Sequence, residues 1–214
     1  MMKVTFLNNK ISNNITNIVI KKPEGAYFNI IKPTLDILAA IILLVITLPI
    51  WLIISLFIKL DSPGPIIFKQ VRIGKDGKEF LIYKFRTMYQ DVLSQGRSPT
   101  SDDDPRITRV GKLLRKTSLD ELPQLINIIK GEMSFIGPRP EQKLIVDKYY
   151  TNYEKQRFLV KPGITGLWQV SLDRTKPIHE NLQYDFTYIN NVSLFMDLKI
   201  LFKTIVIMFR SNTF

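Results

Sequence analysis

One long apolar run dominates the hydrophobic pattern of this chain. Residues 37–58 carry no charged side chain, and as a single helix they would be about 33 Å long, which matches the hydrocarbon thickness of a bilayer. A spanning helix is the default interpretation of such a run. Pro49 lies inside it, however, and a proline within a helix removes a backbone hydrogen bond and kinks the axis.

Basic residues on both sides of this run favour a second interpretation. A spanning segment normally has its excess of lysine and arginine on the cytoplasmic side alone. Here both flanks look cytoplasmic, so a helix that is broken at Pro49 and enters and leaves by the same face also fits the pattern. The spanning and the re-entrant interpretations both remain open from the residues alone. The flanking cations are Lys21, Lys22 and Lys32 before the run and Lys59, Lys69, Arg72 and Lys75 after it.

The hydrophobic pattern of residues 61–196 predicts one compact unit without an internal linker. Strand-like segments at Ile66–Gln70 and Glu79–Phe85 flank a Gly74–Gly77 turn and predict a hairpin. The remaining pattern is mostly helical, so the predicted fold class is α+β with helices predominating. Beyond the hairpin we expect a polar loop over 90–105, helices over 107–116, 141–158 and 178–190, and a rigid loop over 161–166.

The C-terminal segment 197–210 has an amphipathic pattern. Lys199, Lys203 and Arg210 fall on one helical stripe, and Leu, Ile, Phe and Met fill the rest of the surface. This arrangement is typical of a helix that lies in a membrane interface. A core helix with one solvated edge would give the same pattern.

Composition limits the partners and the kinds of chemistry that we expect for this chain. The net charge of +11 suggests an anionic partner, which could be nucleic acid, a phospholipid surface or a phosphorylated substrate. The chain has no cysteine, which excludes disulfides, zinc thiolates and thiol chemistry. The first ten residues lack a long apolar segment, so we do not expect a cleaved signal peptide.

The strongest candidate chemistry is a pair of adjacent acids, Asp120 and Glu121, just before an apolar helical run. If Asp120 caps that helix, Pro123 falls in the first turn, where a missing N–H is tolerated. The helix dipole would then keep both carboxylates ionised and lower their pKa values. Such a carboxylate is a good nucleophile or metal ligand. From the residues alone, a simple capping role is an equally open alternative.

Several basic residues could bind phosphate. Arg139 is the best candidate, because Pro138 and Pro140 hold its backbone still and a guanidinium matches phosphate oxygens in bidentate geometry. No phosphate-binding glycine loop or dinucleotide fingerprint occurs, so ordinary kinase, NTPase and Rossmann interpretations lose their usual support. The other basic candidates are Lys84, Arg86, Arg109 and Arg115. Two weaker candidates are the acidic triplet Asp102–Asp104, which we interpret as a charged loop rather than a metal site, and the single histidine, His179, expected at the surface.

Taken together, the motifs resemble the bacterial sugar transferase family, the monotopic polyprenyl-phosphate phosphoglycosyl transferases of small, single-domain type. The resemblance runs in order over residues 30–208, and its specificity comes from the number of motifs. They are Asp-Ser-Pro-Gly-Pro (61–65), Phe-Lys-Gln-Val-Arg-Ile-Gly (68–74), Tyr-Lys-Phe-Arg-Thr-Met (83–88), Asp-Asp-Pro-Arg-Ile-Thr-Arg-Val-Gly (103–111), Ser-Leu-Asp-Glu-Leu-Pro-Gln-Leu (118–125), Gly-Glu-Met-Ser-Phe-Ile-Gly-Pro-Arg-Pro (131–140), Lys-Pro-Gly-Ile-Thr-Gly-Leu-Trp-Gln-Val (161–170) and Asp-Leu-Lys-Ile-Leu (197–201).

The resemblance implies a reaction and a set of roles. A sugar 1-phosphate would pass from a nucleotide sugar, usually a UDP-sugar, to polyprenyl phosphate, the initiating step of bacterial surface glycan synthesis. Asp120 would attack the sugar-bearing phosphate and form a covalent intermediate, assisted by Glu121 and Mg²⁺. Arg139 and Arg115 would contact phosphate, and we place Lys84 and Arg86 beside them as further phosphate ligands.

The same resemblance implies an organisation in the membrane. It favours a re-entrant helix on the cytosolic face of the bacterial cytoplasmic membrane, with phospholipid rather than nucleic acid as the large anionic partner. The expected segments are an N-terminal arm (1–29), the re-entrant helix (30–60), a catalytic domain (61–196) and the interfacial helix (197–214). A non-catalytic scaffold for polysaccharide assembly is the rival interpretation. The sugar, the glycan pathway and the formation of a homodimer stay open.

Three departures from the family pattern bear on these expectations. The family often has serine before the helix-breaking proline, whereas this chain has Leu48 there and Thr47 one residue earlier, whose hydroxyl could still satisfy a freed carbonyl. After Gln169-Val170 the order Ser171-Leu172-Asp173-Arg174 loses a glycine and shifts an arginine, which weakens Arg174 as a ligand. Residues 1–29 have no counterpart in the pattern.

Overall fold

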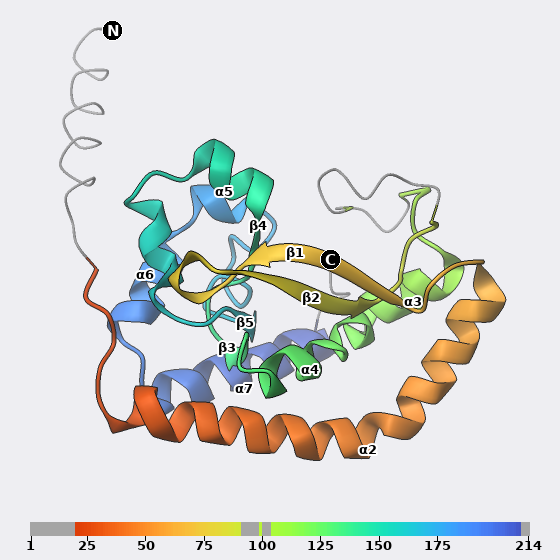
Figure 1. Ribbon diagram of the computed structural model, residues 1–214, viewed down its shortest axis with the longest axis horizontal. Helices are drawn as coiled ribbons and strands as arrows, with labels where there is room; N and C mark the ends of the chain where they lie inside the picture. The colour runs from red at the N-terminus through yellow and green to blue at the C-terminus, as the bar shows by residue number, and fades with distance from the viewer. Residues whose placement is uncertain (1–19, 91–98, 100–103, 211–214) are drawn as a thin grey trace, which may run out of the picture.

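The computed structural model describes residues 20–90, 99 and 104–210 and has an α+β fold in which helices predominate (Figure 1). A long apolar helix and the C-terminal helix run along one side, and a β-hairpin lies above them. In chain order, the elements are η1 (Tyr27–Ile31), α2 (Lys32–Asp61), β1 (Ile67–Ile73), η2 (Lys75–Gly77), β2 (Glu79–Phe85), α3 (Arg109–Lys116), η3 (Leu119–Glu121), α4 (Gln124–Ile129), β3 (Ser134–Ile136), β4 (Glu141–Gln142), α5 (Lys143–Tyr149), η4 (Glu154–Leu159), β5 (Gly163–Thr165), η5 (Ile178–Glu180), α6 (Gln183–Asn190) and α7 (Leu194–Arg210).

The apolar run forms one continuous helix, α2, with Pro49 inside it. The prediction of two helices separated by a break is therefore wrong, and Figure 1 shows instead that the axis of α2 bends before it reaches β1. Proline explains a bend, because its ring displaces the preceding turn. The Thr47 hydroxyl donates to the Leu43 carbonyl at 2.7 Å. The carbonyl that Pro49 deprives of its helical donor is that of Val45, four residues earlier, so Thr47 does not replace the lost bond.

Both ends of α2 are tied to the same folded unit. At its start, the Lys32 ammonium lies 2.9 Å from a carboxylate oxygen of Asp197 at the start of α7. At its end, the backbone N–H of Val110 in α3 donates to the Asp61 carboxylate at 3.0 Å. By length and composition, Tyr27–Asp61 could cross a membrane. Its two ends nevertheless contact the same folded unit, at α7 and at α3.

The predicted hairpin is confirmed. β1 and β2 pair antiparallel from Ile67 opposite Phe85 to Ile73 opposite Glu79, so β1 extends three residues beyond its predicted end. The tight connection uses two residues with positive φ, Asp76 at 56° and Gly77 at 73°. Glycine adopts this conformation without steric cost.

The segment 141–158 is not the single helix that its pattern predicts. Glu141–Gln142 forms a short strand, β4, that pairs with β1. α5 then ends at Tyr149, and a separate 3₁₀ segment, η4, begins at Glu154. The Glu154 carboxylate accepts the backbone N–H of Thr151 at 2.7 Å, which stabilises the turn between the two helices.

The other C-terminal predictions are partly right. The predicted loop over 161–166 contains β5, which pairs in parallel with β3. The predicted helix over 178–190 consists of a 3₁₀ turn, η5, followed by α6.

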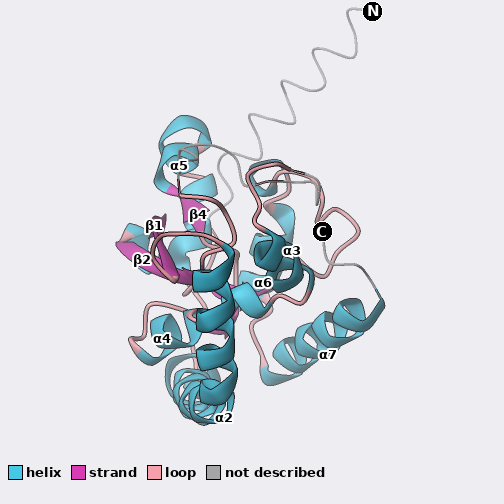
Figure 2. Cartoon of the chain, turned by 90° about the vertical axis from the view of Figure 1, so that its right-hand side faces the viewer, coloured by secondary structure: helices cyan, strands magenta, loops and turns pink. Residues whose placement is uncertain are grey.

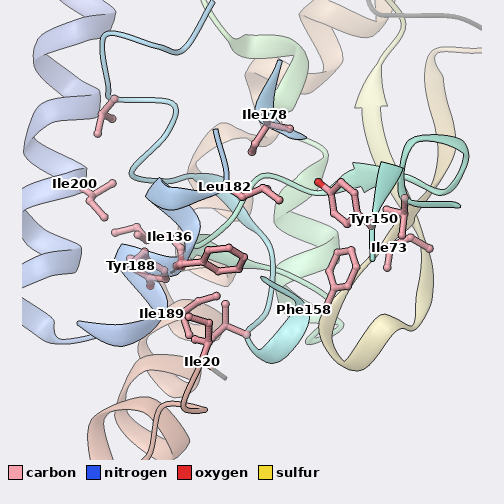
Figure 3. Packing of buried hydrophobic residues seen from close by; sticks show 14 residues of the cluster. Ile20, Ile73, Ile136, Tyr150, Phe158, Ile178, Leu182, Tyr188, Ile189 and Ile200 are labelled. Atoms are coloured by element: carbon pink, nitrogen blue, oxygen red, sulfur yellow. Dashed lines mark hydrogen bonds between the residues drawn. The ribbon is translucent and has the colours of Figure 1, made fainter. Parts of the chain in front are cut away.

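Three buried hydrophobic clusters hold the described elements together, and two of them bear on the placement of the acid pair. In the larger one, shown in Figure 3, Ile136 of β3 lies beside Tyr188 and Ile189 of α6. In the second, Ile82 of β2 and Ile128 of α4 pack with Ala40 of α2. α4 is therefore held between the hairpin and the long apolar helix, and the acid pair just before α4 is fixed by the same packing.

The C-terminal helix α7 begins three residues before its predicted start, at Leu194. It buries Ile200 completely but exposes Phe195 and Phe202. Lys199 and Lys203 are exposed as well. Figures 1 and 2 both show α7 on the same side of the molecule as α2.

Candidate active site

The acid pair Asp120–Glu121 lies in a 3₁₀ turn between α3 and α4. The expectation that Asp120 caps a helix is wrong, because α4 begins at Gln124 after Pro123 and has no side-chain cap. Just before the pair, Ser118 has a left-handed backbone with φ 56° and ψ 16°. The turn presents the two carboxylates next to each other rather than at a helix end.

Two cations from distant parts of the chain approach these carboxylates. The ammonium nitrogen of Lys84, on β2, is 2.5 Å from Glu121 Oε1 and 3.8 Å from Asp120 Oδ2. The guanidinium of Arg139 is 3.9 Å from Glu121 Oε1. The predicted association of Asp120, Glu121, Lys84 and Arg139 is therefore present in the fold.

Burial raises the pKa values of both acids, and these cations lower them. Burial raises the pKa of the Asp120 carboxyl, against the opposing charges of Lys84, Arg115 and Arg139. Burial also raises the pKa of Glu121, but Lys84 and Arg139 outweigh it and the net pKa is lowered. The predicted lowering by a helix dipole is thus wrong for Asp120, and for Glu121 the cause is neighbouring cations.

The turn that carries Arg139 is fixed by close backbone packing. The N–H of Gly163 donates to the Pro138 carbonyl at 2.9 Å, and the N–H of Gly137 donates to the Thr165 carbonyl at 2.9 Å. A Cβ atom on Gly163 would come within 2.2 Å of the Gly137 nitrogen, so a side chain there would separate the two segments. The buried Arg157 donates to the Arg139 carbonyl at 2.7 Å.

An open cleft of about 250 Å³ lies against this cluster. Its walls come from the hairpin, from the start of α4 and from the Arg139 turn. Its lining includes three cationic side chains and one acidic side chain, a charge balance that suits an anionic ligand. The lining residues are Arg72, Ile82, Lys84, Glu121, Gln124, Arg139, Pro140, Gly163 and Ile164.

Two other predicted phosphate ligands differ in their placement. Burial lowers the pKa of Arg115, and the charge of Asp120 opposes that change, so Arg115 belongs to the electrostatic surroundings of the acid pair. Arg86 is 5% exposed, does not line the cleft, and donates to the Ser62 carbonyl at 2.7 Å. The structure therefore places Arg86 at the end of α2, where it satisfies carbonyls that the helix leaves without donors.

The weaker candidates lie apart from the cluster. Asp104 forms a two-point ion pair with Arg106, at 2.8 Å to Nε and 2.7 Å to Nη2, whereas Asp102 and Asp103 lie outside the described residues. His179 stacks on Tyr149 with ring centroids 4.6 Å apart. Arg109 is exposed on α3 and Arg174 follows Asp173 in a turn, and neither lines the cleft.

The sequence did not single out two residues of the site. Gln124, at the start of α4, is buried and donates to Glu121. Arg72 lines the cleft from β1. Side-chain alternation in a hairpin could have identified Arg72, because it places Arg72 on the same face as Lys84, provided the register was known.

The acid pair fits a magnesium ion only if other ligands complete the coordination shell. Among the described residues no three acidic, histidine or cysteine side chains gather into a cluster. Mg²⁺ commonly uses one or two carboxylates together with water and substrate phosphates. Asp120 and Glu121 match that donor set, and Lys84 now holds the Glu121 oxygen that a metal would use.

Comparison with known proteins identifies the family. Residues 27–211 match the family model described as bacterial sugar transferase. The chain belongs to this family. A relative from Aeromonas hydrophila, named UDP-N-acetylgalactosamine-undecaprenyl-phosphate N-acetylgalactosaminephosphotransferase, is 45% identical over 180 residues, which cover 82% of this chain and 43% of that protein.

Two further relatives span the size range of the sugar transferases matched. The Escherichia coli (strain K12) UDP-glucose:undecaprenyl-phosphate glucose-1-phosphate transferase is 39% identical over 190 residues, or 86% of this chain and 41% of that protein. The exopolysaccharide production protein PSS of Rhizobium leguminosarum bv. phaseoli is 39% identical over 189 residues, or 83% of this chain and 94% of that protein. The chain thus spans less than half the length of the two named transferases but nearly all of the third relative.

Proposed function

We propose that this bacterial sugar transferase moves a sugar 1-phosphate from a UDP-sugar to undecaprenyl phosphate and so initiates a surface glycan. The names of the relatives support the substrate classes. The observation that carries the proposal is the pair of buried Asp120 and adjacent Glu121, which lines a cleft together with Lys84 and Arg139. An anionic nucleophile can approach an anionic diphosphate only where cations offset the charge of both.

In the proposed first half-reaction, a carboxylate oxygen of Asp120 forms a bond to the phosphorus that carries the sugar. The phosphorus–oxygen bond to the nucleoside monophosphate breaks, and UMP leaves with the electron pair. In the second half-reaction, an oxygen of undecaprenyl phosphate attacks the same phosphorus and the bond to Asp120 breaks. The enzyme returns to its starting state, and undecaprenyl diphosphate sugar is the product.

The cations nearest the acid pair have parts in this scheme. Lys84 and Arg139 neutralise phosphate charge that increases as the leaving group departs. Lys84, Arg115 and Arg139 also favour the ionised form of Asp120, the only form that can attack. A bound Mg²⁺, held by Glu121 and Asp120 in our proposal, would add Lewis-acid stabilisation of the phosphate oxygens.

We further propose that α2 is re-entrant, with both ends on the cytosolic side of the cytoplasmic membrane. Lys32 and Asp61, at opposite ends of α2, both contact the unit that carries the site. A helix that crossed the bilayer would separate its ends by the full membrane thickness. α7, which exposes Phe195 and Phe202, would lie in the interface on the same side. Labelling of introduced cysteines from each side of the membrane tests this placement.

The covalent step has a direct test. UDP-sugar and Mg²⁺ without undecaprenyl phosphate should release at most about one UMP per active enzyme, because the phosphosugar remains on Asp120. Intact-mass spectrometry should show the added phosphosugar and map it to Asp120. Asp120→Asn should abolish the burst and the turnover, since an amide is a poor nucleophile. Glu121→Gln should weaken both while the nucleophile stays present.

Asp147→Asn is the matched control, because Asp147 is an exposed acid on α5. It should leave the burst and the turnover unchanged. A fully active Asp120→Asn enzyme, checked for deamidation back to aspartate, would show that the chemistry lies elsewhere. A folded wild-type enzyme that turns over none of a panel of UDP-sugars would favour the scaffold interpretation.

A further inference from the structure

Arg72 lines the cleft but has no role in the reaction as set out above. It lies on β1, and the register pairs it with Phe80 of β2. Side chains alternate along a strand, and directly paired residues share a face. Arg72 therefore lies on the same face of the hairpin as Ile82 and Lys84, and all three line the cleft.

The protein meets only part of the hydrogen-bonding capacity of Arg72. The side chain is 13% exposed, and its Nη2 donates to Gln70 at 2.7 Å. Its nearest carboxylate oxygen, on Glu141, is 3.8 Å from Nη1, beyond hydrogen-bonding distance. The Nε atom is buried and has no hydrogen-bond partner in the described part of the chain. A guanidinium has five N–H donors, so a bound oxyanion could satisfy several that the protein does not.

The electrostatics of the cleft also favour an anionic ligand. Burial lowers the pKa of Arg72 to about 10, and repulsion from Arg139 adds to that change. Glu141 and Glu121 oppose it without cancelling it. Two guanidinium groups thus face one cleft and repel each other. A phosphate bound between them would offset that repulsion.

The positions of the two arginines suggest that they bind different phosphates of the substrate. Arg139 is 3.9 Å from Glu121, beside the nucleophile, whereas Arg72 is 3.8 Å from Glu141 and pairs with Gln142 of β4, which follows the Arg139 turn. In an in-line displacement the leaving oxygen departs on the side opposite the attacking oxygen. We propose that Arg72 binds the phosphate that leaves with the nucleoside, while Arg139 binds the phosphate that carries the sugar. This assignment rests on the proposed transferase function.

Equilibrium binding tests the phosphate contact without turnover. Purified enzyme in detergent with Mg²⁺ is titrated with UDP and, separately, with uridine, which lacks the phosphates. Arg72→Gln should weaken UDP binding roughly tenfold to a hundredfold, the range expected for lost hydrogen bonds to a charged group, and leave uridine binding unchanged. Arg72→Lys keeps the charge but not the bidentate geometry and should fall between wild type and Arg72→Gln.

Lys69→Gln is the matched control, because Lys69 is an exposed cation on the same strand and on the opposite face of the hairpin. It should bind UDP like the wild type. Folded Arg72→Gln with wild-type affinity for UDP would overturn the proposal. If Arg72→Gln does not fold, Arg72→Lys decides: a weaker preference for UDP over uridine supports the contact, and an unchanged preference rejects it.

Separated half-reactions locate the contact along the reaction. Arg72→Gln should slow the release of UMP from UDP-sugar in the first half-reaction. Transfer from preformed phosphosugar-enzyme to undecaprenyl phosphate should slow as well, because the acceptor oxygen must also attack in line with the bond to Asp120, and its phosphate enters the position that the nucleoside phosphate has left. A defect confined to the second half-reaction would instead assign Arg72 to the acceptor phosphate and overturn the proposal. If the wild-type enzyme releases no UMP, the proposed function fails, while the UDP titration still reports on Arg72.

Discussion

At the scale of single residues, Asp120 combines burial with a need for negative charge. It is 7% exposed, and this burial raises the pKa of its carboxyl, which disfavours the charged form. Lys84, Arg115 and Arg139 act against that effect. In the proposed reaction two of these cations also meet the phosphates of the substrate. One set of cations would therefore both prepare the nucleophile and stabilise the leaving charge.

The backbone of Ser118 makes a testable contribution to this arrangement. Its φ of 56° is left-handed, which costs a residue with a side chain about 1–2 kcal/mol relative to ordinary backbone. Ser118→Val should lower the free energy of unfolding by about 1–2 kcal/mol, because a β-branched residue tolerates this conformation poorly, and should reduce the UMP burst by displacing Asp120. Ser118→Gly should keep both near wild type. Chemical denaturation and the burst assay measure the two effects.

The neighbouring Thr117 provides the control, since its φ of −97° is ordinary. Thr117→Val should leave the burst intact. A Ser118→Val enzyme with wild-type stability and burst would mean that the turn adapts without cost.

At the residue level, local sequence pointed to side chains that lie together in the fold, while their proposed roles stay predictions. The adjacent acids and the proline-flanked Arg139 could be picked out in this way, and they meet in the fold with Lys84. The capping role of Asp120 failed because the Ser118 turn and Pro123 shift the helix start to Gln124. Arg72 was not identified as a site residue, because its place in the cleft depends on strand register, which no local motif encodes.

At the scale of elements, a group of polar contacts connects the two apolar helices, α2 and α7. We call this group the polar tether. Asp197, at the start of α7, accepts hydrogen bonds from Tyr27 at 2.6 Å and Tyr188 at 2.9 Å, besides pairing with Lys32. Asp36 of α2 accepts the Ser134 hydroxyl at 2.7 Å. The start of α2 is thus joined to α7, α6 and β3, which also position the Arg139 turn.

Removal of one member of this tether should be costly. The side chains of Lys32 and Asp197 are 10% and 6% exposed, so Lys32→Met leaves a buried carboxylate without its cation. We expect a loss of about 2–3 kcal/mol in the free energy of unfolding, below the usual range for such pairs because two tyrosines still donate to Asp197. Denaturant unfolding in detergent measures this loss.

An exposed ion pair in the same chain is the matched control. Lys143 and Glu79 are 2.6 Å apart, but their side chains are 54% and 49% exposed. Lys143→Met should cost less than about 1 kcal/mol, because solvent screens the pair. Equal small losses for both variants would mean that the tether adds little to stability.

Sequence pattern predicted the elements unevenly, for physical reasons. The hairpin was found because alternating strands and a glycine turn are local signals. β3 and β5 were missed because three-residue strands exist only through their pairing with each other. The segment 141–158 looked helical throughout, but pairing of Glu141–Gln142 with β1 and the turn at Thr151 overrode that preference.

At the scale of the whole molecule, the two helices that carry most of the exposed large hydrophobic side chains of the described residues share one side. α2 and α7 lie on one side, and α5 lies on the other (Figure 1). The cleft is lined by the hairpin, the start of α4 and the Arg139 turn. Such an arrangement suits a reaction between a lipid-borne acceptor and a soluble nucleotide sugar. The sequence indicated both apolar segments, but it could not show that they share a side, because that depends on long-range contacts such as Lys32–Asp197.

Cysteine accessibility in membrane vesicles tests this placement, and the absence of native cysteine makes every introduced thiol unique. Lys22 and Lys78 are exposed and lie on opposite sides of α2 in the sequence. Lys22→Cys and Lys78→Cys should both react with an impermeant maleimide in inside-out vesicles and stay protected in right-side-out vesicles. Phe202→Cys on α7 should be protected by lipid in both, because a side chain in the interface is screened from an aqueous reagent.

Leu144→Cys is the control for Phe202→Cys, since the two side chains are 69% and 68% exposed and Leu144 lies on α5, away from α2 and α7. It should react freely in inside-out vesicles, and detergent should make both positions equally reactive. Reaction of Lys22→Cys and Lys78→Cys from opposite faces would establish a spanning α2. Equal reactivity of Phe202→Cys and Leu144→Cys before detergent would remove α7 from the interface. Both expected results together would place the cleft at the cytosolic surface, where a phosphate borne by a membrane lipid can reach Asp120.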